Sequence, residues 1–583
     1  MRAVAQMKST PSNIKVLGSL AMMPFIEREE LAAAADLPSS TVRDTLNRLR
    51  KNRMVEFVPH ARSGSSLVKR GCLTLTGVEA LAKLRLKGET PHDLIYGLSV
   101  SAQERRNVAR RLDVAVVLYR IAQEVGTLQT GISDWRWGRR GGLDATMTLV
   151  DGGVVGISRI GSTHSGEATS NRLDTIVGMH GRESKFVTLL LVPGPVEVSR
   201  VLSRVSSSDI NLFVASETDV MSSPRSADIW HGLDGRMSSL EALLPIMENS
   251  VLPPDIRMQS HRRVTLPSEM LAGDVSGLDL VACDLTIPAK DILRLLYDWP
   301  FIRFSQLQAM LGVGEGHLRH TTALLSRLGL VHHLRIGNTP KQRHDNETRL
   351  YLSAAALRYL SYVDRSDIAE MNNRWLVVPD PTGDSVHPVA NYAVQGGAAS
   401  RLLDERLHTD GVYAFVVMLF DACSNSSRWD VRQALPAHRS ERPFRVDTGH
   451  ERNIRPDATF LIEHAGRQFA FVLEYERRAN VPTRNTALPN RMAPKVERYT
   501  NYYASAETAH DFVDGRPKIL VVFENIEDEA VFYAYVSMDG ANALPMLVSN
   551  RPLLEREGVL GRTWLFPWRL DLGRQPLQVI LPR

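Results

Sequence analysis

The chain has 583 residues, 43% of them hydrophobic and 23% charged, and a formal net charge of +5. One hydrophobic core does not serve a chain of this length, so we expect roughly three to five domains. The composition is that of folded domains and excludes a chain that is disordered for lack of apolar residues. The small positive charge permits an anionic partner without requiring one, so the distribution of charge must decide.

The cysteines and the apolar stretches indicate the cellular compartment. Cys72, Cys283 and Cys423 lie far apart in no metal-type spacing, which argues against a disulfide framework or a zinc site and favours a reducing compartment. Residues 1–10 contain no apolar run, and the most apolar stretch, residues 412–420, is far shorter than the ~20 residues that span a bilayer. We therefore expect a cytoplasmic protein without a membrane partner.

Residues 16–55 align without a gap on residues 292–331, which indicates an internal duplication. The stretch Pro24-Phe25-Ile26 falls on Pro300-Phe301-Ile302, and the apolar positions around it match as well. In the first copy we expect a short helix at 29–35, a turn, and a helix from an N-cap at Ser39 or Ser40 to about residue 51. The second copy predicts helices at 305–311 and 315–328.

An extended segment with a flexible tip follows the helices of each copy, at residues 55–75 and 331–352. Each copy therefore predicts a winged helix-turn-helix, over residues 12–90 and 286–368. The tips contain glycine, serine or proline, at residues 63–66 and 337–340.

Positive charge is concentrated in these two modules, as DNA binding requires. Residues 39–70 contain eight Lys or Arg against two acidic residues, and residues 314–349 contain six against three. Double-stranded DNA is the partner this predicts, and the alternative is a pair of winged helices that dock only proteins. The residues expected to contact DNA are Ser40, Thr41, Arg43, Asn47, Arg48, Lys51, Arg62, Lys69 and Arg70 in the first copy and His317, Arg319, His320, Arg335, Lys341 and Arg343 in the second.

The similarity continues beyond the wings, because residues 143–147 resemble residues 456–460 and each opens a strand-turn-strand pattern. Amphipathic helices at 110–123 and 398–421 precede these patterns. We expect α/β domains at 100–250 and 385–583 and a linker at 251–285. The expected strands and helices are 154–160, 172–177 and 185–192 in the earlier domain, and 469–476, 495–503 and 518–523 in the later one.

The later α/β domain has a carboxylate pattern that suits a metal. Asp457 heads one strand, Glu474 lies on the next, and Glu476 shares its face by the strand period. Asp457 and Glu474 could hold Mg²⁺ through oxygen ligands, and the cation would serve phosphodiester cleavage. In the earlier domain Asp144 is kept but Ser158 aligns with Glu474, so we expect that copy to be degenerate.

This pattern resembles the PD-(D/E)xK nuclease superfamily through Pro456-Asp457 and Glu474-Tyr475-Glu476. The lysine position of the motif holds Glu476, and Lys495 lies where a lysine moved to the following helix would be. The resemblance implies a restriction-endonuclease-like α/β domain after each winged helix, hence an α+β or α/β multidomain fold. It also implies that Asp457, Glu474, Glu476 and Lys495 are catalytic.

The winged helix together with Leu407-His408-Thr409, Asp457, the Glu474 strand and Lys495 with Tyr499 is similar to the replication-relaxation family of plasmid and mobile-element proteins. The similarity covers about residues 288–535. It implies a role in plasmid replication or mobilisation during conjugation, with a relaxase or replication protein as partner. The alternative is a non-catalytic winged-helix regulator whose α/β domains serve assembly, with Asp457 and Glu474 as ion-paired strand-end charges. The oligomeric state stays open.

Overall fold

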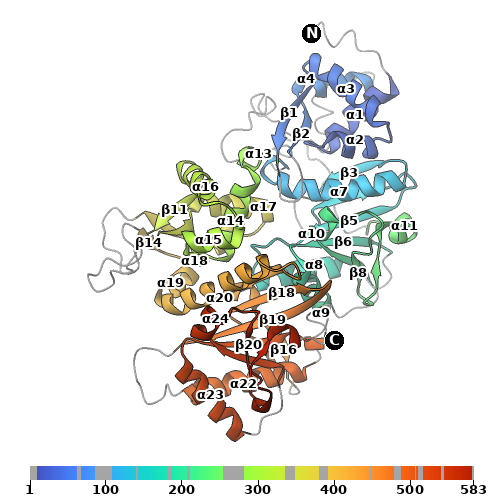
Figure 1. The fold of residues 1–583 in the computed structure, drawn as a ribbon. Coiled ribbons are helices and arrows are strands. Elements are labelled where there is room, and N and C mark those ends of the chain that lie inside the picture. Colours follow the sequence, from blue (N-terminus) through green and yellow to red (C-terminus); the bar gives the residue numbers. More distant parts are fainter. Residues whose placement is uncertain are drawn as a thin grey trace. The chain divides into compact units, whose positions relative to one another are not determined.

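The structure is a computed structural model of the chain (Figure 1). It describes residues 10–61, 67–85, 108–138, 142–180, 185–205, 210–253, 281–334, 348–379, 392–446, 450–477, 488–505, 507–509, 512, 516–539 and 544–580. The chain divides into unit 1, Met1–Asp291 with Arg358–Asp367, and unit 2, Ile292–Leu357 with Ile368–Arg583. The mixed helices and sheets confirm a multidomain α/β class. No helix in the described ranges is long and apolar enough to cross a membrane.

The N-terminal part of unit 1 has three helices followed by a hairpin. Their bounds are α1 (Pro11–Met22), α2 (Arg28–Ala34), α3 (Ser39–Lys51), β1 (Val55–His60), β2 (Val68–Leu73) and α4 (Leu75–Arg85). The expected helices are therefore confirmed to within one residue. The expected N-cap is wrong: Pro38 occupies that position, and the Ser39 hydroxyl donates to Glu29 at 2.8 Å instead.

The same order recurs from residue 287 onward. Its bounds are α14 (Ile287–Asp298), β10 (Ile302–Arg303), α15 (Phe304–Leu311), α16 (Glu315–Arg327), β11 (Val331–Leu334), β12 (Arg349–Leu352) and α17 (Ala354–Asp364). Three matched pairs of positions have left-handed backbone: Phe25 and Phe301 (φ 64° and 61°), Asp36 and Gly312 (49° and 62°), and Arg53 and Gly329 (56° and 68°). Residues other than glycine disfavour this region, so its recurrence at aligned positions, four of them non-glycine, reflects a shared chain path.

In unit 1 the Pro24-Phe25 carbonyls are held by side chains from distant elements. The Tyr119 hydroxyl donates to the Pro24 carbonyl at 2.6 Å, and Arg70 Nη1 donates to the Phe25 carbonyl at 3.3 Å. Arg70 is 2% exposed and also donates to Glu30 at 2.8 Å. These bonds connect the three-helix part to the helix that carries Tyr119, α7 (Leu112–Leu128).

Unit 2 repeats this arrangement with its own residues. The Tyr413 hydroxyl donates to the Pro300 carbonyl at 2.9 Å, and Arg349 Nη1 donates to the Phe301 carbonyl at 3.2 Å. Arg349 is 1% exposed and pairs with Asp410 at 2.7 Å. Tyr413 and Asp410 both lie on α20 (Arg406–Ser424), so this helix holds the hairpin of its unit.

A seven-stranded sheet in the order β3-β4-β5-β6-β7-β8-β9 forms the rest of unit 1. The pairs β3-β4 and β4-β5 are antiparallel, β5-β6 and β6-β7 are parallel, and the last two pairs are antiparallel. Apolar residues of β6 pack with α8 and α9. The elements are β3 (Asp134–Trp137), β4 (Ala145–Thr148), β5 (Val154–Arg159), α8 (Gly166–Met179), β6 (Val187–Val192), α9 (Pro195–Arg204), β7 (Asn211–Ser216), α10 (Glu217–Ser222), β8 (Trp230–Gly232), β9 (Met237–Ser238), α11 (Leu240–Glu248) and α13 (Val281–Asp284).

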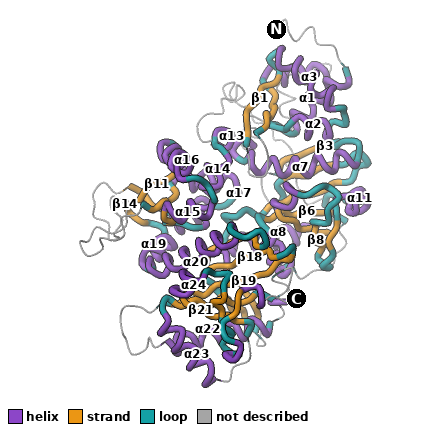
Figure 2. Tube along the Cα trace, in the orientation of Figure 1, coloured by secondary structure: helices purple, strands orange, loops and turns teal. Residues whose placement is uncertain are grey.

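Unit 2 has a five-stranded sheet in the order β15-β18-β19-β20-β21, with the same sequence of antiparallel, antiparallel, parallel and parallel pairs. Figure 2 labels three of these strands, β18, β19 and β21. Its main elements are β15 (Trp429–Pro436), β18 (Ala458–His464), β19 (Arg467–Glu476), α22 (Leu488–Ala504), β20 (Lys518–Phe523), α23 (Ile526–Asp539), β21 (Met546–Asn550) and α24 (Arg551–Glu557). Tyr499 and Tyr502 of α22 belong to the core against this sheet.

Smaller elements complete unit 2. They are α18 (Ile368–Trp375), β13 (Val377–Pro379), β14 (Tyr392–Val394), α19 (Gly397–Asp404), α21 (Ala437–Ser440), β16 (Arg442–Arg445), β17 (Glu451–Ile454), β22 (Arg562–Trp564) and β23 (Gln575–Pro576), with 3-10 turns at Glu507–Ala509, Leu570–Leu572 and Leu577–Ile580. The single helix expected at 398–421 is wrong. Glu405 leaves the helical path at φ −94° and ψ 25°, and so separates α19 from α20.

The buried Arg70–Glu30 pair predicts a large effect on stability. Glu30→Ala should lower the free energy of unfolding of this part of unit 1 by about 3–5 kcal/mol, because it leaves a buried guanidinium without its carboxylate. Asp44→Ala is the control, since Asp44 is 73% exposed and its removal should cost under about 0.5 kcal/mol. Hydrogen exchange of peptides from residues 11–61 measures both. Equal protection in the two variants would contradict the predicted role of the pair.

Candidate functional site

Asp457 lies at the head of β18, where the backbone of the next strand fixes it. Its amide donates to the Leu473 carbonyl at 2.8 Å, and the Tyr475 amide donates to its Oδ2 at 2.7 Å. His408 Nε2, from α20, hydrogen-bonds Oδ1 at 3.0 Å. Burial alone would raise the pKa of Asp457, but the hydrogen bond and charge of His408, together with Lys495, outweigh it and hold the pKa below its usual value.

Glu474 and Glu476 point to the same face of β19, where Lys495 of α22 meets both. Lys495 Nζ lies 2.6 Å from Glu474 Oε2 and 2.5 Å from Glu476 Oε1, and the Tyr499 hydroxyl donates to Glu474 Oε1 at 2.6 Å. Burial and the nearby Asp457 charge raise the pKa of Glu474, although Lys495 and Tyr499 act against the rise. Burial would lower the pKa of Lys495, but the surrounding carboxylates raise it.

The structure thus places Glu474, Glu476 and Lys495 in direct contact, and Asp457 beside them on the adjacent strand. Tyr499 and His408 complete the cluster. Tyr499 follows Lys495 by one helical turn, a spacing that the sequence displays. The contact of His408 with Asp457 has no such local pattern, because 49 residues separate the two.

The donor set fits a hard divalent cation. Asp457 and Glu474 supply carboxylate oxygens from adjacent strands. The described residues include no group of three or more His, Cys, Asp or Glu side chains with metal-site geometry. Mg²⁺ commonly takes one or two protein carboxylates and completes its shell with water and substrate phosphate, so two are sufficient. The positive charge of Lys495 would stabilise the negative charge that develops on the phosphate during cleavage.

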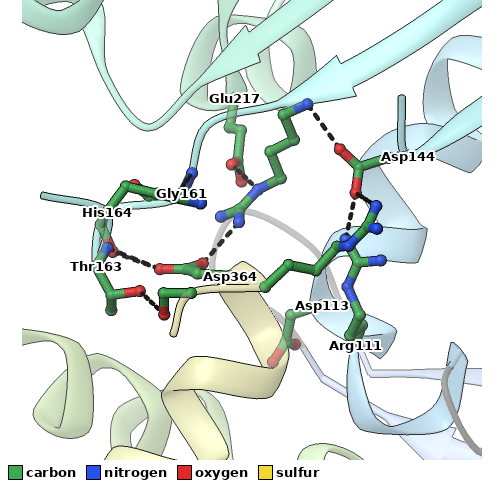
Figure 3. A network of polar contacts seen from close by, with 12 residues as sticks. Arg111, Asp113, Asp144, Gly161, Thr163, His164, Glu217 and Asp364 are labelled. Carbon is green, nitrogen blue, oxygen red and sulfur yellow. Dashed lines mark hydrogen bonds and ion pairs between the residues drawn. The ribbon is translucent and has the colours of Figure 1, made fainter. Parts of the chain in front are cut away.

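Asp144 has the equivalent backbone position in unit 1, but other side chains surround it (Figure 3). Its amide donates to the Ile157 carbonyl at 2.8 Å, and the Arg159 amide donates to its Oδ2 at 2.8 Å. Arg111 and Arg172 each donate to it at 2.6 Å. Burial would raise the pKa of Asp144, but these guanidinium charges hold the pKa far below its usual value.

Ser158 takes the place that Glu474 has in unit 2. Each of these residues follows the strand residue that accepts the aspartate amide, Ile157 in one unit and Leu473 in the other. The Ser158 hydroxyl donates to the Gly142 carbonyl at 2.5 Å, so it supplies no carboxylate to the cluster. The site in unit 1 lacks the second acidic ligand on β5.

The side chains expected to contact DNA in the first copy are mostly exposed. Those exposed on α3 or β2 are Ser40, Arg43, Asn47, Arg48, Lys51 and Lys69, and Thr41 is half-buried. Arg70 is buried and ion-paired with Glu30, so its inclusion among surface cations is wrong. Arg62 lies outside the described residues.

The second copy presents fewer described cations. His317, Arg319 and His320 are exposed on α16, and Arg319 pairs with Glu315 at 2.5 Å. Arg335, Lys341 and Arg343 lie outside the described residues.

No family model, curated protein or solved structure matches the chain. Function is therefore inferred from these residues and their geometry.

The His408–Asp457 pair predicts a pH-dependent contribution to stability. Burial would lower the pKa of His408, but Asp457 raises it above the ordinary value. A raised folded-state pKa stabilises below the unfolded pKa of about 6.5, and this stabilisation disappears as pH rises through the folded value. The difference in unfolding free energy between the wild type and His408→Gln should therefore shrink from pH 6 toward pH 8.5.

Denaturant titrations at several pH values measure this difference. Asp457→Asn with and without His408→Gln is the control, because the histidine should then contribute no such dependence. A difference that grows with pH would contradict a raised pKa of His408.

Proposed function

We propose that the chain binds double-stranded DNA and is a tandem duplication of a winged helix-turn-helix followed by a restriction-endonuclease-like α/β domain. The observation that carries DNA binding is the exposed cationic face of α3. Val42, Leu46 and Leu49 of this helix are buried, whereas Arg43 and Lys51 are exposed. A helix so oriented presents cations to phosphates and polar groups to base edges.

Four features support the proposed duplication. The order of helices and hairpin recurs, matched positions share left-handed backbone, and the two sheets begin with the same series of strand pairings. Fourth, an aspartate immediately before β4 or β18 accepts an amide hydrogen bond from the adjacent strand, from Arg159 or Tyr475. Unrelated domains would have no reason to share all four.

The α3 surface predicts a specific reduction of DNA affinity. Arg43→Ala with Lys51→Ala should weaken binding to any duplex, and should reduce the slope of log K against log salt by about 0.9 for each phosphate that is no longer neutralised. Arg236→Ala with Arg556→Ala is the matched control. These arginines are 87% and 71% exposed, so the control removes the same charge from other surfaces.

Fluorescence anisotropy of a labelled duplex at several salt concentrations measures both affinity and slope. The control pair should keep the wild-type slope. Identical slopes in both double variants, or no DNA binding by the wild type, would contradict the proposal.

The cluster of Asp457, Glu474 and Lys495 supports a second function, metal-dependent cleavage of DNA. Mg²⁺ bound there would polarise a phosphodiester and activate water. Asp457 and Glu474 would hold the cation, Lys495 would face the scissile phosphate, and Glu476 and Tyr499 would orient Lys495 and Glu474. With the resemblance to replication-relaxation proteins, this extends the proposal to DNA processing in plasmid replication or mobilisation, with a relaxase or replication protein as partner.

Cleavage can be separated from a purely regulatory role. Supercoiled plasmid with Mg²⁺ or Mn²⁺ should be nicked by the wild type, and Asp457→Ala or Glu474→Ala should lower the rate about 100-fold or more. Asp430→Ala is the control, because Asp430 is 62% exposed on β15. Cleavage that persists in both site variants, or none by the wild type, would leave the non-catalytic DNA-binding regulator.

A further inference from the structure

The arginines around Asp144 form a cluster that the proposed cleavage reaction does not use (Figure 3). Arg111 immediately precedes α7, and Arg172 lies on α8. Each donates through Nη2 at 2.6 Å, Arg111 to Oδ1 and Arg172 to Oδ2. Because Arg111 and Arg172 bind the two oxygens of one carboxylate, their guanidinium groups are close enough to each other to bind one small anion together.

The cluster carries more positive charge than Asp144 can neutralise. Arg365 also approaches Asp144, at 3.1 Å, so three guanidinium groups surround one carboxylate. Arg159 pairs with Glu217 and Asp364, so four guanidinium groups face three carboxylates in this region and one positive charge remains.

The two guanidinium groups also retain hydrogen-bonding capacity. Within the described ranges Arg111 and Arg172 have no hydrogen bond besides those to Asp144, and the Nε atom of each is buried without a partner. Burial lowers the pKa of Arg111 to about 10 despite the neighbouring carboxylate, and Arg365 and Arg159 act in the same direction. Buried cationic donors that exceed their acceptors are costly unless an anion joins them.

The arginines, and not the aspartate, reach the surface. Their side chains are 14% and 12% exposed, whereas Asp144 is fully buried. Asp144 therefore orients the two guanidinium groups from the interior of the domain. The counterpart in unit 2 has the opposite balance, with Asp457, Glu474 and Glu476 near one lysine. The acidic cluster suits a cation, and the basic cluster suits an anion.

We propose that Arg111 and Arg172 bind a phosphate group of the DNA backbone directly, without a metal and without cleavage. Guanidinium groups match phosphate oxygens in geometry and remain charged at any physiological pH. The degenerate domain would then be a second DNA-holding surface. This inference rests on the proposed DNA binding, but its site is separate from α3.

The test uses the full chain with Arg172→Gln and Arg172→Lys. Arg172→Gln should weaken duplex binding about tenfold at fixed salt and reduce the salt slope by about 0.9. Arg172→Lys keeps the charge but not the planar fork, so it should weaken binding with little change in slope, and it remains informative if Arg172→Gln does not fold. Arg120→Gln is the control, since Arg120 is paired with Glu124 on α7 of the same unit.

Thermal unfolding with added inorganic pyrophosphate supplies a readout that does not need DNA. Pyrophosphate should stabilise the wild type and Arg120→Gln but neither Arg172 variant. If the α3 variants lose DNA affinity while both folded Arg172 variants match the wild type, this inference is wrong and DNA binding stands. If the wild type binds no duplex, the proposed function is wrong, and the pyrophosphate shift alone then decides whether the anion site exists.

Discussion

An aspartate at the head of an inner strand, fully buried in unit 1 and 19% exposed in unit 2, is the constraint on which both sheets depend. In each unit it accepts the amide of a residue on the neighbouring strand, Arg159 for Asp144 and Tyr475 for Asp457. That bond joins the strand ends, but it cannot by itself offset the cost of burying a charge. Each unit must therefore bring cations to this point from elements outside the pair of strands.

The two units meet this requirement with different side chains and so acquire different chemistry. Around Asp144 the compensation is made by guanidinium groups, which remain charged and fill the space with donors. Around Asp457 it is made by His408 and, less directly, by Lys495. The smaller cations leave room for Glu474 and Glu476, so only this unit places additional carboxylates beside the aspartate.

The sequence predicted what depends on local periodicity. The alternation along residues 469–476 put Glu474 and Glu476 on one face, and the apolar spacing located α2, α3, α15 and α16 to within one residue. It could not distinguish a buried cation from an exposed one. Arg70 counts as positive charge in any tally, but its carboxylate partner lies 40 residues earlier on α2.

Contacts between distant segments were also beyond local patterns. Arg365 reaches Asp144 across 221 residues, and nothing in the sequence around either residue predicts that approach. The same holds for His408 and Asp457, since the break at Glu405 sets where α20 begins and hence which turn faces the sheet. Such contacts are decided by how elements pack, which residue spacing does not encode.

The helix α20 connects the two proposed functional parts of unit 2. His408 contacts Asp457, Asp410 pairs with Arg349 at the start of β12, and Tyr413 holds the Pro300 carbonyl. These residues fall within about one and a half helical turns, or about 8 Å along the axis. A helical segment this short bends little. A displacement of the hairpin that moved Arg349 would therefore shift His408 relative to Asp457. The Arg349–Asp410 and His408–Asp457 contacts both depend on the position of α20.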